Sequence, residues 1–267
     1  MKTRSHAVRA LQGALVRTGM WIERASVIDD VRQLVEALRV VPSPRPLVRI
    51  GSTLDGGYLV PDDLDGIAAC ISPGVSTEVG FDLDLAERGI DIFMADASVA
   101  GPPVSHPRFH FTRKFLDTFD SDTTVTLDDF VRDVAPGKDL ILEMDIEGAE
   151  WRVFHSLSAE TLQRFRIMAV EFHDMVNLFS HFGFREIAAV FRKILATHAV
   201  VHIHPNNVTG PVECGGLSVP SLLEFTFHRR DRGTFAPGPL AFPHPLDAPC
   251  VAGLPDYPLP ACWYRGT

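Results

Sequence analysis

Three carboxylates stand close together in the middle of the chain, directly after an apolar run. Residues 140–142 have the character of a buried central strand, and Asp145, Glu147 and Glu150 follow them, interrupted by Gly148. In an open α/β sheet, ligands bind outside the carboxyl ends of the strands, so chemistry is expected here. Glu147 and Glu150 could instead favour the N-terminus of the following helix through its dipole. For Asp145 we predict a chemical role.

Histidines follow two later apolar runs and are expected at the same edge of the sheet. His173 ends one run, and His202 and His204 share one face of the strand predicted from residue 199 onwards. A histidine or carboxylate that removes a proton from an acceptor contributes roughly 10²–10⁴-fold to the rate of a group transfer. We therefore predict Asp145 and His173 as catalytic residues, with His173 as the base. A histidine that only hydrogen-bonds within the sheet edge is the alternative.

The same side chains could also bind a divalent metal ion. Asp145, His173, His202 and His204 offer carboxylate and imidazole ligands, and a bound metal would lower the pKa of an acceptor hydroxyl. Group transfer to a deprotonated acceptor needs no metal, so this site is kept as an alternative and is not favoured. Glu224 lies within an apolar run, where an unpaired carboxylate is costly. We expect it to pair with one of these histidines or with an amide.

A strand, a glycine-containing loop and a helix come earlier in the chain and are typical of a cofactor site. Gly74 lies in this loop, and Asp96 ends the next strand about twenty residues later, where an acidic residue can accept hydrogen bonds from a ribose. The loop lacks the further glycines that seat a pyrophosphate, so a dinucleotide is disfavoured. A cofactor with a ribose and no phosphates, such as S-adenosylmethionine, fits better. A structural turn with a surface aspartate is the alternative.

Predicted strands alternate with predicted helices along the chain, and these elements must position the candidate site residues. An amphipathic helix is predicted over 184–195, and Thr126 with Asp129 is predicted to cap another. No helix separates the last two strands, which indicates an antiparallel pair at the sheet edge. The alternation specifies an α/β fold with a mostly parallel sheet. The seven predicted strands are 67–71, 91–95, 109–111, 140–142, 167–172, 199–203 and 222–227.

Both ends of the chain differ in sequence pattern from this part with alternating strands and helices. A helix is predicted over 27–38, with Ser26 and Asp29 as a capping box, and the basic segment before it could touch a membrane surface or a partner, although a solvated helix face is preferred. Prolines in 41–46 predict a stiff connector. Eight prolines between Pro237 and Pro260 predict an extended tail, and its final aromatic residues suggest that it docks on the protein.

Composition excludes several classes of protein. The net charge of −9 argues against nucleic acid as a partner, because phosphate binding relies on a basic surface. No apolar run approaches the roughly 18 residues of a membrane span, and no signal peptide is expected. The four cysteines form no C-x-x-C pair, so their spacing indicates neither a disulfide framework nor a zinc site. A reducing, cytoplasmic location is expected.

The run LEMDIEGAE at 142–150 resembles the E-x-D-x-E-G-x-E signature of the FkbM-type family of S-adenosylmethionine-dependent methyltransferases. The run TLDDF at 126–130 supports the resemblance, and the segment 49–61 with its Asp-Gly-Gly-Tyr is similar to a bacterial subgroup. The resemblance covers about residues 49–229. It implies a class I methyltransferase fold, a Rossmann-like three-layer sandwich with a seven-stranded, mostly parallel sheet and a terminal antiparallel pair.

The resemblance also implies residue roles. Gly74 and Glu78 would lie along the cofactor loop, Asp96 would bind the ribose, and Asp145 would face the reacting centre. The loop reads SPGVSTE, where the family usually has D-x-G-A-N-x-G, so the groups that hold the methionine end are not set by it. The turn at 55–58 could compensate by closing over the cofactor. The predicted cofactor-binding residues are therefore Asp55, Gly56, Gly57, Tyr58, Ser72, Gly74, Glu78 and Asp96.

Together these observations predict an S-adenosylmethionine-dependent O-methyltransferase acting on a small-molecule or glycan-like acceptor. The choice of oxygen rests on the resemblance and on the carboxylate and histidine side chains at the sheet edge. Alternatives are a non-catalytic cofactor-binding module of the same fold and a metal-dependent hydrolase that uses the histidines. The predicted division is an N-terminal helical extension (1–46), a methyltransferase domain (47–232) and a proline-rich tail packed on it (233–267). The acceptor and the oligomeric state are not predicted.

Overall fold

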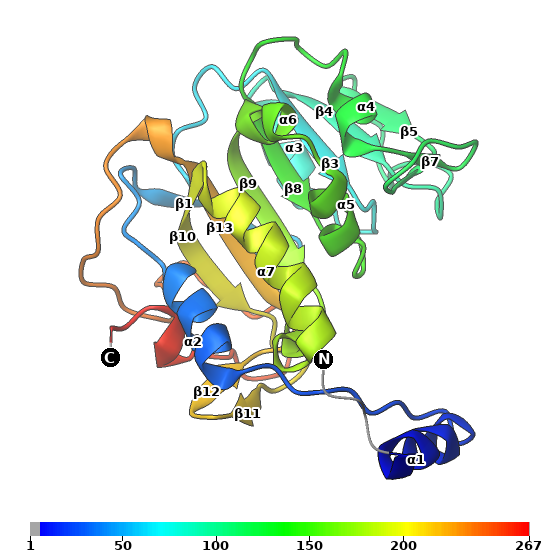
Figure 1. Cartoon of the computed structure of the whole chain (residues 1–267). Coiled ribbons are helices and arrows are strands. Elements are labelled where there is room, and N and C mark those ends of the chain that lie inside the picture. The colour runs from blue at the N-terminus through cyan, green and yellow to red at the C-terminus, as the bar shows by residue number, and fades with distance from the viewer. Residues whose placement is uncertain (1–5, 267) are drawn as a thin grey trace.

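A seven-stranded sheet forms the centre of the molecule (Figure 1). The structure, a computed structural model, describes residues 6–266. The strand order is β10-β13-β9-β8-β3-β4-β5, and every neighbouring pair is parallel except those of β13, which runs antiparallel to both β9 and β10. This confirms the predicted mixed sheet. Its strands are β3 (Ala69–Pro73), β4 (Asp91–Ala95), β5 (Phe109–Thr112), β8 (Leu140–Met144), β9 (Phe165–Phe172), β10 (His198–Pro205) and β13 (Leu223–Arg229).

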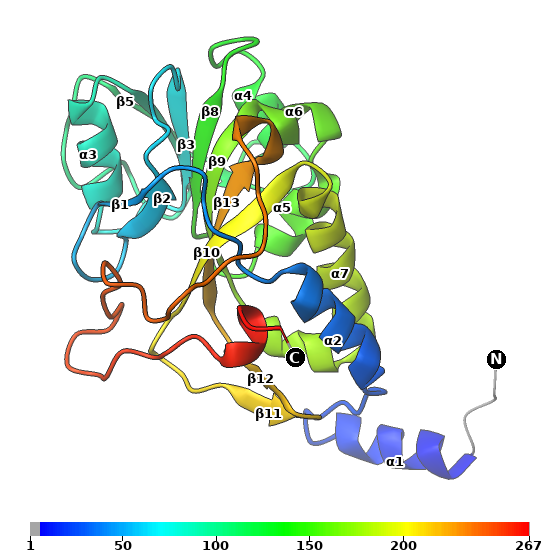
Figure 2. The same cartoon turned by 90° about the vertical axis from the view of Figure 1, so that its left-hand side faces the viewer.

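Both faces of the sheet are covered, as a parallel sheet requires (Figure 2). On one face lie α2 (Ile28–Ala37), α5 (Glu150–Ser156), α6 (Ala159–Arg164) and α7 (His181–Leu195), and on the other lie α3 (Gly80–Glu87) and the hairpin of β1 (Leu47–Ile50) and β2 (Tyr58–Pro61). Helix α7 follows its predicted period, because Phe184, Ile187, Phe191 and Ile194 all point into the core. The short elements are β6 (Phe115–Leu116), β7 (Thr124–Val125), α4 (Leu127–Val131), β11 (Val212–Cys214) and β12 (Leu217–Val219).

The predicted helix caps have mixed outcomes. The Thr126 hydroxyl accepts from the backbone N–H of Asp129 at 3.1 Å, which confirms the cap of α4. The capping box at Ser26 is wrong: α2 begins at Ile28, its N-cap is Val27, and no side chain caps it. The reason is tertiary, since the Ser26 hydroxyl donates instead to the carbonyl oxygen of Ser180, 2.8 Å away.

The C-terminal tail returns to the sheet and α2 (Figure 2). Trp263 is fully buried, packs edge-on against Phe225 with ring centroids 6.1 Å apart, and donates from its indole nitrogen to the carbonyl oxygen of Ser218 at 3.0 Å. The backbone N–H of Val40 donates to the carbonyl oxygen of Trp263. The expectation that the end of the tail docks is therefore confirmed, and the division into three regions stays a prediction.

At the other end, α1 (His6–Val16) stands apart from the sheet in both views (Figures 1 and 2). The side chains of Leu11 and Val16 are exposed. Within residues 6–266, none of the helices combines the length and the apolar character needed to cross a bilayer.

Candidate functional site

A cavity of about 490 Å³ opens at the carboxyl ends of the central strands. It is lined by residues 74–76 after β3, by Asp96 after β4 and by residues 145–147 after β8. Strands β3 and β8 are neighbours, and the chain builds outward from them in opposite directions, through β4 and β5 on one side and β9 on the other. Such a switch point leaves a crevice where ligands of α/β proteins bind.

Gly74 and Asp96 fix the cofactor side of this cavity. Gly74 has a φ of +94°, and a Cβ atom at this position would lie 1.8 Å from the carbonyl oxygen of Asp145, so only glycine fits. The Asp96 carboxylate accepts from the backbone N–H of Val75 at 3.0 Å and from the N–H and hydroxyl of Ser98 at 2.7 and 2.6 Å. Asp96 thereby ties the loop after β3 to the loop after β4.

The turn at 55–58 lies beside the cofactor loop. Asp55, Gly56 and Tyr58 line the cavity, as does Glu78. A Cβ atom at Gly56 would lie 2.7 Å from the Glu78 Cγ atom. Gly57 does not line the cavity; a Cβ atom there would lie 1.9 Å from the carbonyl oxygen of Ser52, so it serves the fold of the turn. The structure therefore brings the turn at 55–58 next to the loop that contains Glu78. From the sequence, this proximity was expected only because of the family resemblance.

A buried acidic pair forms the floor of the cavity. The Ser72 hydroxyl does not line the cavity itself but donates to Glu143 at 2.9 Å. Glu143 and Asp82 do line it, and both are buried. Burial raises the pKa of Asp82 to about 7, and burial together with the charge of Asp82 raises the pKa of Glu143 well above its usual range. The Oδ1 atom of Asp82 has no hydrogen-bond partner among the described residues.

Negative charge dominates the cavity. Its lining holds seven carboxyl groups and one guanidinium group, that of Arg152. Such a lining favours a cationic ligand and repels phosphates. The carboxyl groups belong to Asp55, Glu78, Asp82, Asp96, Glu143, Asp145 and Glu147.

Of the two predicted catalytic residues, Asp145 lines the cavity, whereas His173 does not line it and lies beside Asp145. The Nε2 atom of His173 is 3.8 Å from Asp145 Oδ1 and 3.4 Å from Glu147 Oε2, and its Nδ1 atom is 3.4 Å from Glu150. Burial raises the pKa of Asp145 to about 6. Burial disfavours a charged His173, but Glu150 and Asp145 outweigh it and raise the pKa of His173 to about 9. At neutral pH the imidazole is therefore protonated.

Glu147 and Glu150 differ in their surroundings. Glu150 is fully buried, and its Oε1 atom accepts from the backbone N–H groups of Ile146 and Gly148 at 3.0 and 3.1 Å. This bonding agrees with the structural interpretation, in which the carboxylate shapes the turn before α5. The Glu147 side chain is 88% exposed, and its φ is +55°. It remains available at the mouth of the cavity.

The region from β4 to α7 carries both the ribose candidate Asp96 and the predicted catalytic pair. Residues 90–194 match the methyltransferase FkbM domain. The match confirms the resemblance, and the chain thus carries a methyltransferase domain. No curated protein matches the chain.

The FkbM domain does not supply the whole cavity. It contains Asp96, Asp145 and His173, whereas Gly74 and the turn at 55–58 precede it and were found from the strand-loop-helix order and the bacterial subgroup. Asp82 also precedes it and was missed, because an acidic residue in a helix is usually read as part of a solvated face. Its position three residues after Val79, on the buried side of the pattern, was the available signal.

The other predicted metal ligands lie beyond the FkbM domain, on strand β10. The Nε2 atom of His202 is 2.9 Å from Asp247 of the tail, and the Nδ1 atom of His204 is 2.9 Å from Glu224, which confirms that Glu224 pairs with a histidine. The predicted set is not brought together as one group. Among the described residues, Asp145 and His173 gather with Glu147, and His204 gathers with Glu224 and Cys250.

Proposed function

We propose that the protein transfers a methyl group from S-adenosylmethionine to a hydroxyl oxygen of a small-molecule or glycan-like acceptor. The observation that carries the proposal is the acidic cavity at the switch point between β3 and β8. S-adenosylmethionine carries a sulfonium and an ammonium group and no phosphate, so its charge suits this lining. A dinucleotide would bring a pyrophosphate against seven carboxyl groups.

The residues present fit this cofactor. Gly74 has no side chain, so a ligand in the cavity can approach its backbone directly. Asp96 offers carboxylate oxygens to ribose hydroxyls. The unpartnered Oδ1 atom of Asp82 and the neighbouring Glu143 are suited to an ammonium group. When bound, the cofactor supplies an electrophilic methyl group. The chain itself has to align the acceptor and take up its proton.

We assign that proton transfer to the pair of His173 and Asp145. The imidazole stands 3.8 Å from the Asp145 carboxylate, so the negative charge of Asp145 stabilises a proton on His173. Burial raises the pKa of Asp145, and the neighbouring acids raise the pKa of His173 against the effect of its burial. The hydroxyl of an acceptor that reaches this pair would lose its proton as the oxygen is methylated.

A second hollow supports a polyhydroxylated acceptor. It measures about 700 Å³ and shares Arg152 with the cofactor cavity. Trp151 and Phe182 contribute aromatic faces, and Asn177 contributes an amide. The Trp151 indole donates to the carbonyl oxygen of His173 at 2.8 Å, which links this hollow to the proposed base. Aromatic faces with a few polar groups are typical of small-molecule sites.

Ligand binding tests the proposal directly. Isothermal titration of the full chain with S-adenosylhomocysteine should show saturable binding, and NAD should give no heat of binding. At 100 times its dissociation constant, S-adenosylhomocysteine should also stabilise the folded protein by about 2.7 kcal/mol. Absence of both signals would reject the cofactor assignment. Transfer of a labelled methyl group to hydroxyl compounds, and its loss with deoxy analogues, then tests the choice of oxygen.

A further inference from the structure

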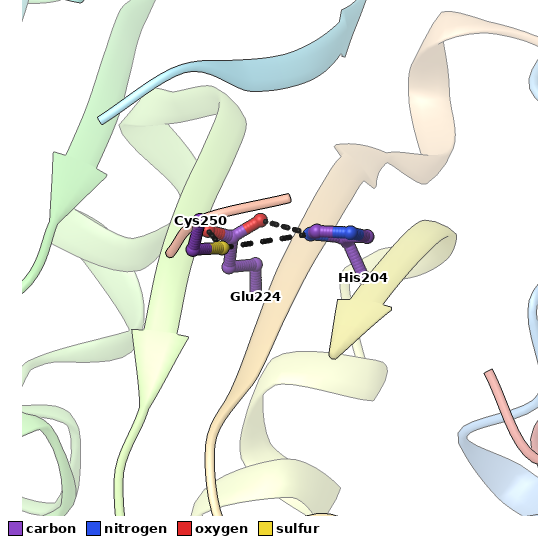
Figure 3. A group of neighbouring side chains, drawn as sticks. All are labelled: His204, Glu224 and Cys250. Atoms are coloured by element: carbon purple, nitrogen blue, oxygen red, sulfur yellow. Dashed lines mark hydrogen bonds and ion pairs between the residues drawn. The ribbon is translucent and has the colours of Figure 1, made fainter. Parts of the chain in front are cut away.

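Three potential metal ligands meet under the tail (Figure 3), and none of them belongs to the lining of the proposed cofactor cavity, although Glu224 lies close to Asp55 of that lining. His204 comes from β10, Glu224 from β13 and Cys250 from the tail. The Nδ1 atom of His204 lies 2.9 Å from Glu224 Oε2, the Cys250 sulfur lies 3.2 Å from Glu224 Oε1, and the same sulfur lies 3.9 Å from His204 Nδ1. All three residues are buried, with exposures of 4%, 6% and 7% respectively.

These separations resemble those within a zinc site. Tetrahedral ligands at zinc distances of about 2.0–2.3 Å stand roughly 3.3–3.7 Å from one another. The two separations from Glu224 end at its two different oxygens, and one donor atom from each of the three residues lies within 4.8 Å of the other two. Side-chain rotations would bring one donor atom of each residue to a single ion. A thiolate, an imidazole and a carboxylate together suit zinc, whereas magnesium and calcium take oxygen ligands only.

A fourth residue supplies an independent observation. The Nε2 atom of His204, on the far side of the ring, lies 3.1 Å from Asp256 Oδ1. A histidine that binds a metal through one nitrogen usually donates its other N–H to a carboxylate, which fixes the tautomer and the ring orientation. With the proton on Nε2, the Nδ1 lone pair faces Glu224 and Cys250. Asp256 is therefore placed as a positioning residue for a ligand.

We propose that His204, Glu224 and Cys250 bind one Zn²⁺ ion, with water in the fourth position. Binding forms bonds from zinc to the Cys250 sulfur, to His204 Nδ1 and to a Glu224 oxygen, and it releases to solvent the thiol proton and, where the imidazole is protonated, the Nδ1 proton of His204. The ion would fasten the tail to the sheet, because β10 and β13 supply two ligands and the tail supplies the third. The cysteine spacing gave no such indication, since these ligands stand 20 and 26 residues apart. The competing account is a protonated His204 held between Glu224 and Asp256 without a metal.

Zinc titration of the full chain separates the two accounts. After the protein has been stripped with a chelator, competition against a chromophoric chelator should show uptake of one Zn²⁺ per chain. Cys250→Ser and His204→Gln should weaken zinc binding at least ~100-fold, and Asp256→Asn should weaken it by about 10–100-fold. Cys214→Ser is the matched control, because Cys214 is also a free thiol but is exposed on β11. It should keep the wild-type affinity.

Cobalt gives a second, spectroscopic test that identifies the sulfur ligand. The wild type and Cys214→Ser should show a thiolate-to-cobalt charge-transfer band with Co²⁺, and Cys250→Ser should lack it. Failure of the stripped wild type to take up zinc, or zinc binding that survives Cys250→Ser unchanged, would overturn the proposal and favour the ion pair. Cys250→Ser changes one atom, so it serves if His204→Gln does not fold. Binding of S-adenosylhomocysteine is measured on the same samples and reports separately on the methyltransferase assignment.

Discussion

Gly74 and Asp145 are in backbone contact, so close that a Cβ atom on the glycine would stand 1.8 Å from the aspartate carbonyl oxygen. The loops that follow β3 and β8 therefore meet without an intervening side chain. The proposed cofactor loop and the loop that carries Asp145 are thus in direct contact, and a side chain at position 74 must displace one of them.

Gly74→Ala should both destabilise the fold and impair cofactor binding. Overpacking costs about 1–3 kcal/mol, and a left-handed φ costs a non-glycine residue roughly 1–2 kcal/mol more. Urea denaturation and titration with S-adenosylhomocysteine measure the two effects. Gly253→Ala is the control, because Gly253 has a φ of +82° and nothing within 4 Å of an added Cβ atom. If both variants lose the same free energy of unfolding and the same affinity for S-adenosylhomocysteine, the contact between Gly74 and Asp145 is not important.

Asp96→Asn should weaken binding of S-adenosylhomocysteine at least tenfold. An amide nitrogen in place of one carboxylate oxygen can no longer accept both from the protein and from a ribose, and a lost hydrogen bond to a charged group costs about 1.5–3 kcal/mol. The matched control is Asp91→Asn at the start of the same strand, where the carboxylate pairs with Arg108 at the surface. Affinity that falls equally in both variants would argue against ribose recognition by Asp96.

Asp82→Asn should stabilise the ligand-free protein and weaken cofactor binding. The pKa of Asp82 is about 7 in the folded state, above its ordinary value of 3.8, so the folded protein holds a proton that the unfolded chain releases. Stability is therefore lost as the pH rises from about 4 to about 7. The amide removes this loss, and the melting temperature at pH 8 should rise by about 2–4 °C per kcal/mol gained.

Glu87→Gln is the control for this effect, because Glu87 lies exposed on the same helix. Its melting temperature and its affinity for S-adenosylhomocysteine should match those of the wild type. If Asp82→Asn binds the ligand as tightly as the wild type does, the assignment of Asp82 to the ammonium group is wrong.

The pH dependence of kcat should identify the proton acceptor. With His173 as the base, kcat rises with pH as the imidazolium loses its proton, and the rise ends near or below pH 9, because a cationic cofactor can only lower this pKa. His173→Gln should lose this rise and about 10²–10⁴-fold in kcat, with binding of S-adenosylhomocysteine kept. His110→Gln, an exposed histidine on β5, should behave as the wild type.

A different profile would move the role to Asp145. A rise centred near pH 6 that persists in His173→Gln and disappears in Asp145→Asn would reject His173 as the base. The two pKa values lie far enough apart for rate measurements between pH 5 and 10 to separate the outcomes.

The parts of the site that could be predicted from sequence are those set by local order. Gly74, Asp96 and Asp145 each follow a strand directly, and parallel strands bring such positions to one edge. Local order does not set where the next helix begins: α3 starts only at Gly80, six residues after Gly74. Here the Ser76 hydroxyl accepts from the backbone N–H of Glu78, and such local bonds compete with the helix.

Contacts made by the tail could not be predicted. Asp247, Cys250 and Asp256 lie in a proline-rich segment with no helical or strand period, so nothing in the sequence indicates which strand they meet. His202 and His204 were correctly placed on one strand, and His204 pairs with Glu224 as expected, but their other partners, Asp247 and Asp256, come from this tail. The sheet order also puts β13 between β9 and β10, which separates these histidines from Asp145.

That strand order has a consequence for folding during synthesis on the ribosome. Within the central sheet of the described residues, β10 pairs only with β13, which is synthesised later, and Trp263, whose indole packs on Phe225 of β13, is synthesised later still. At roughly 5–20 residues per second, β10 waits on the order of seconds with both edges open. The sheet therefore closes only after β13 has been synthesised, and nascent chains that stop before residue 223 should depend on chaperones that shield unpaired strands.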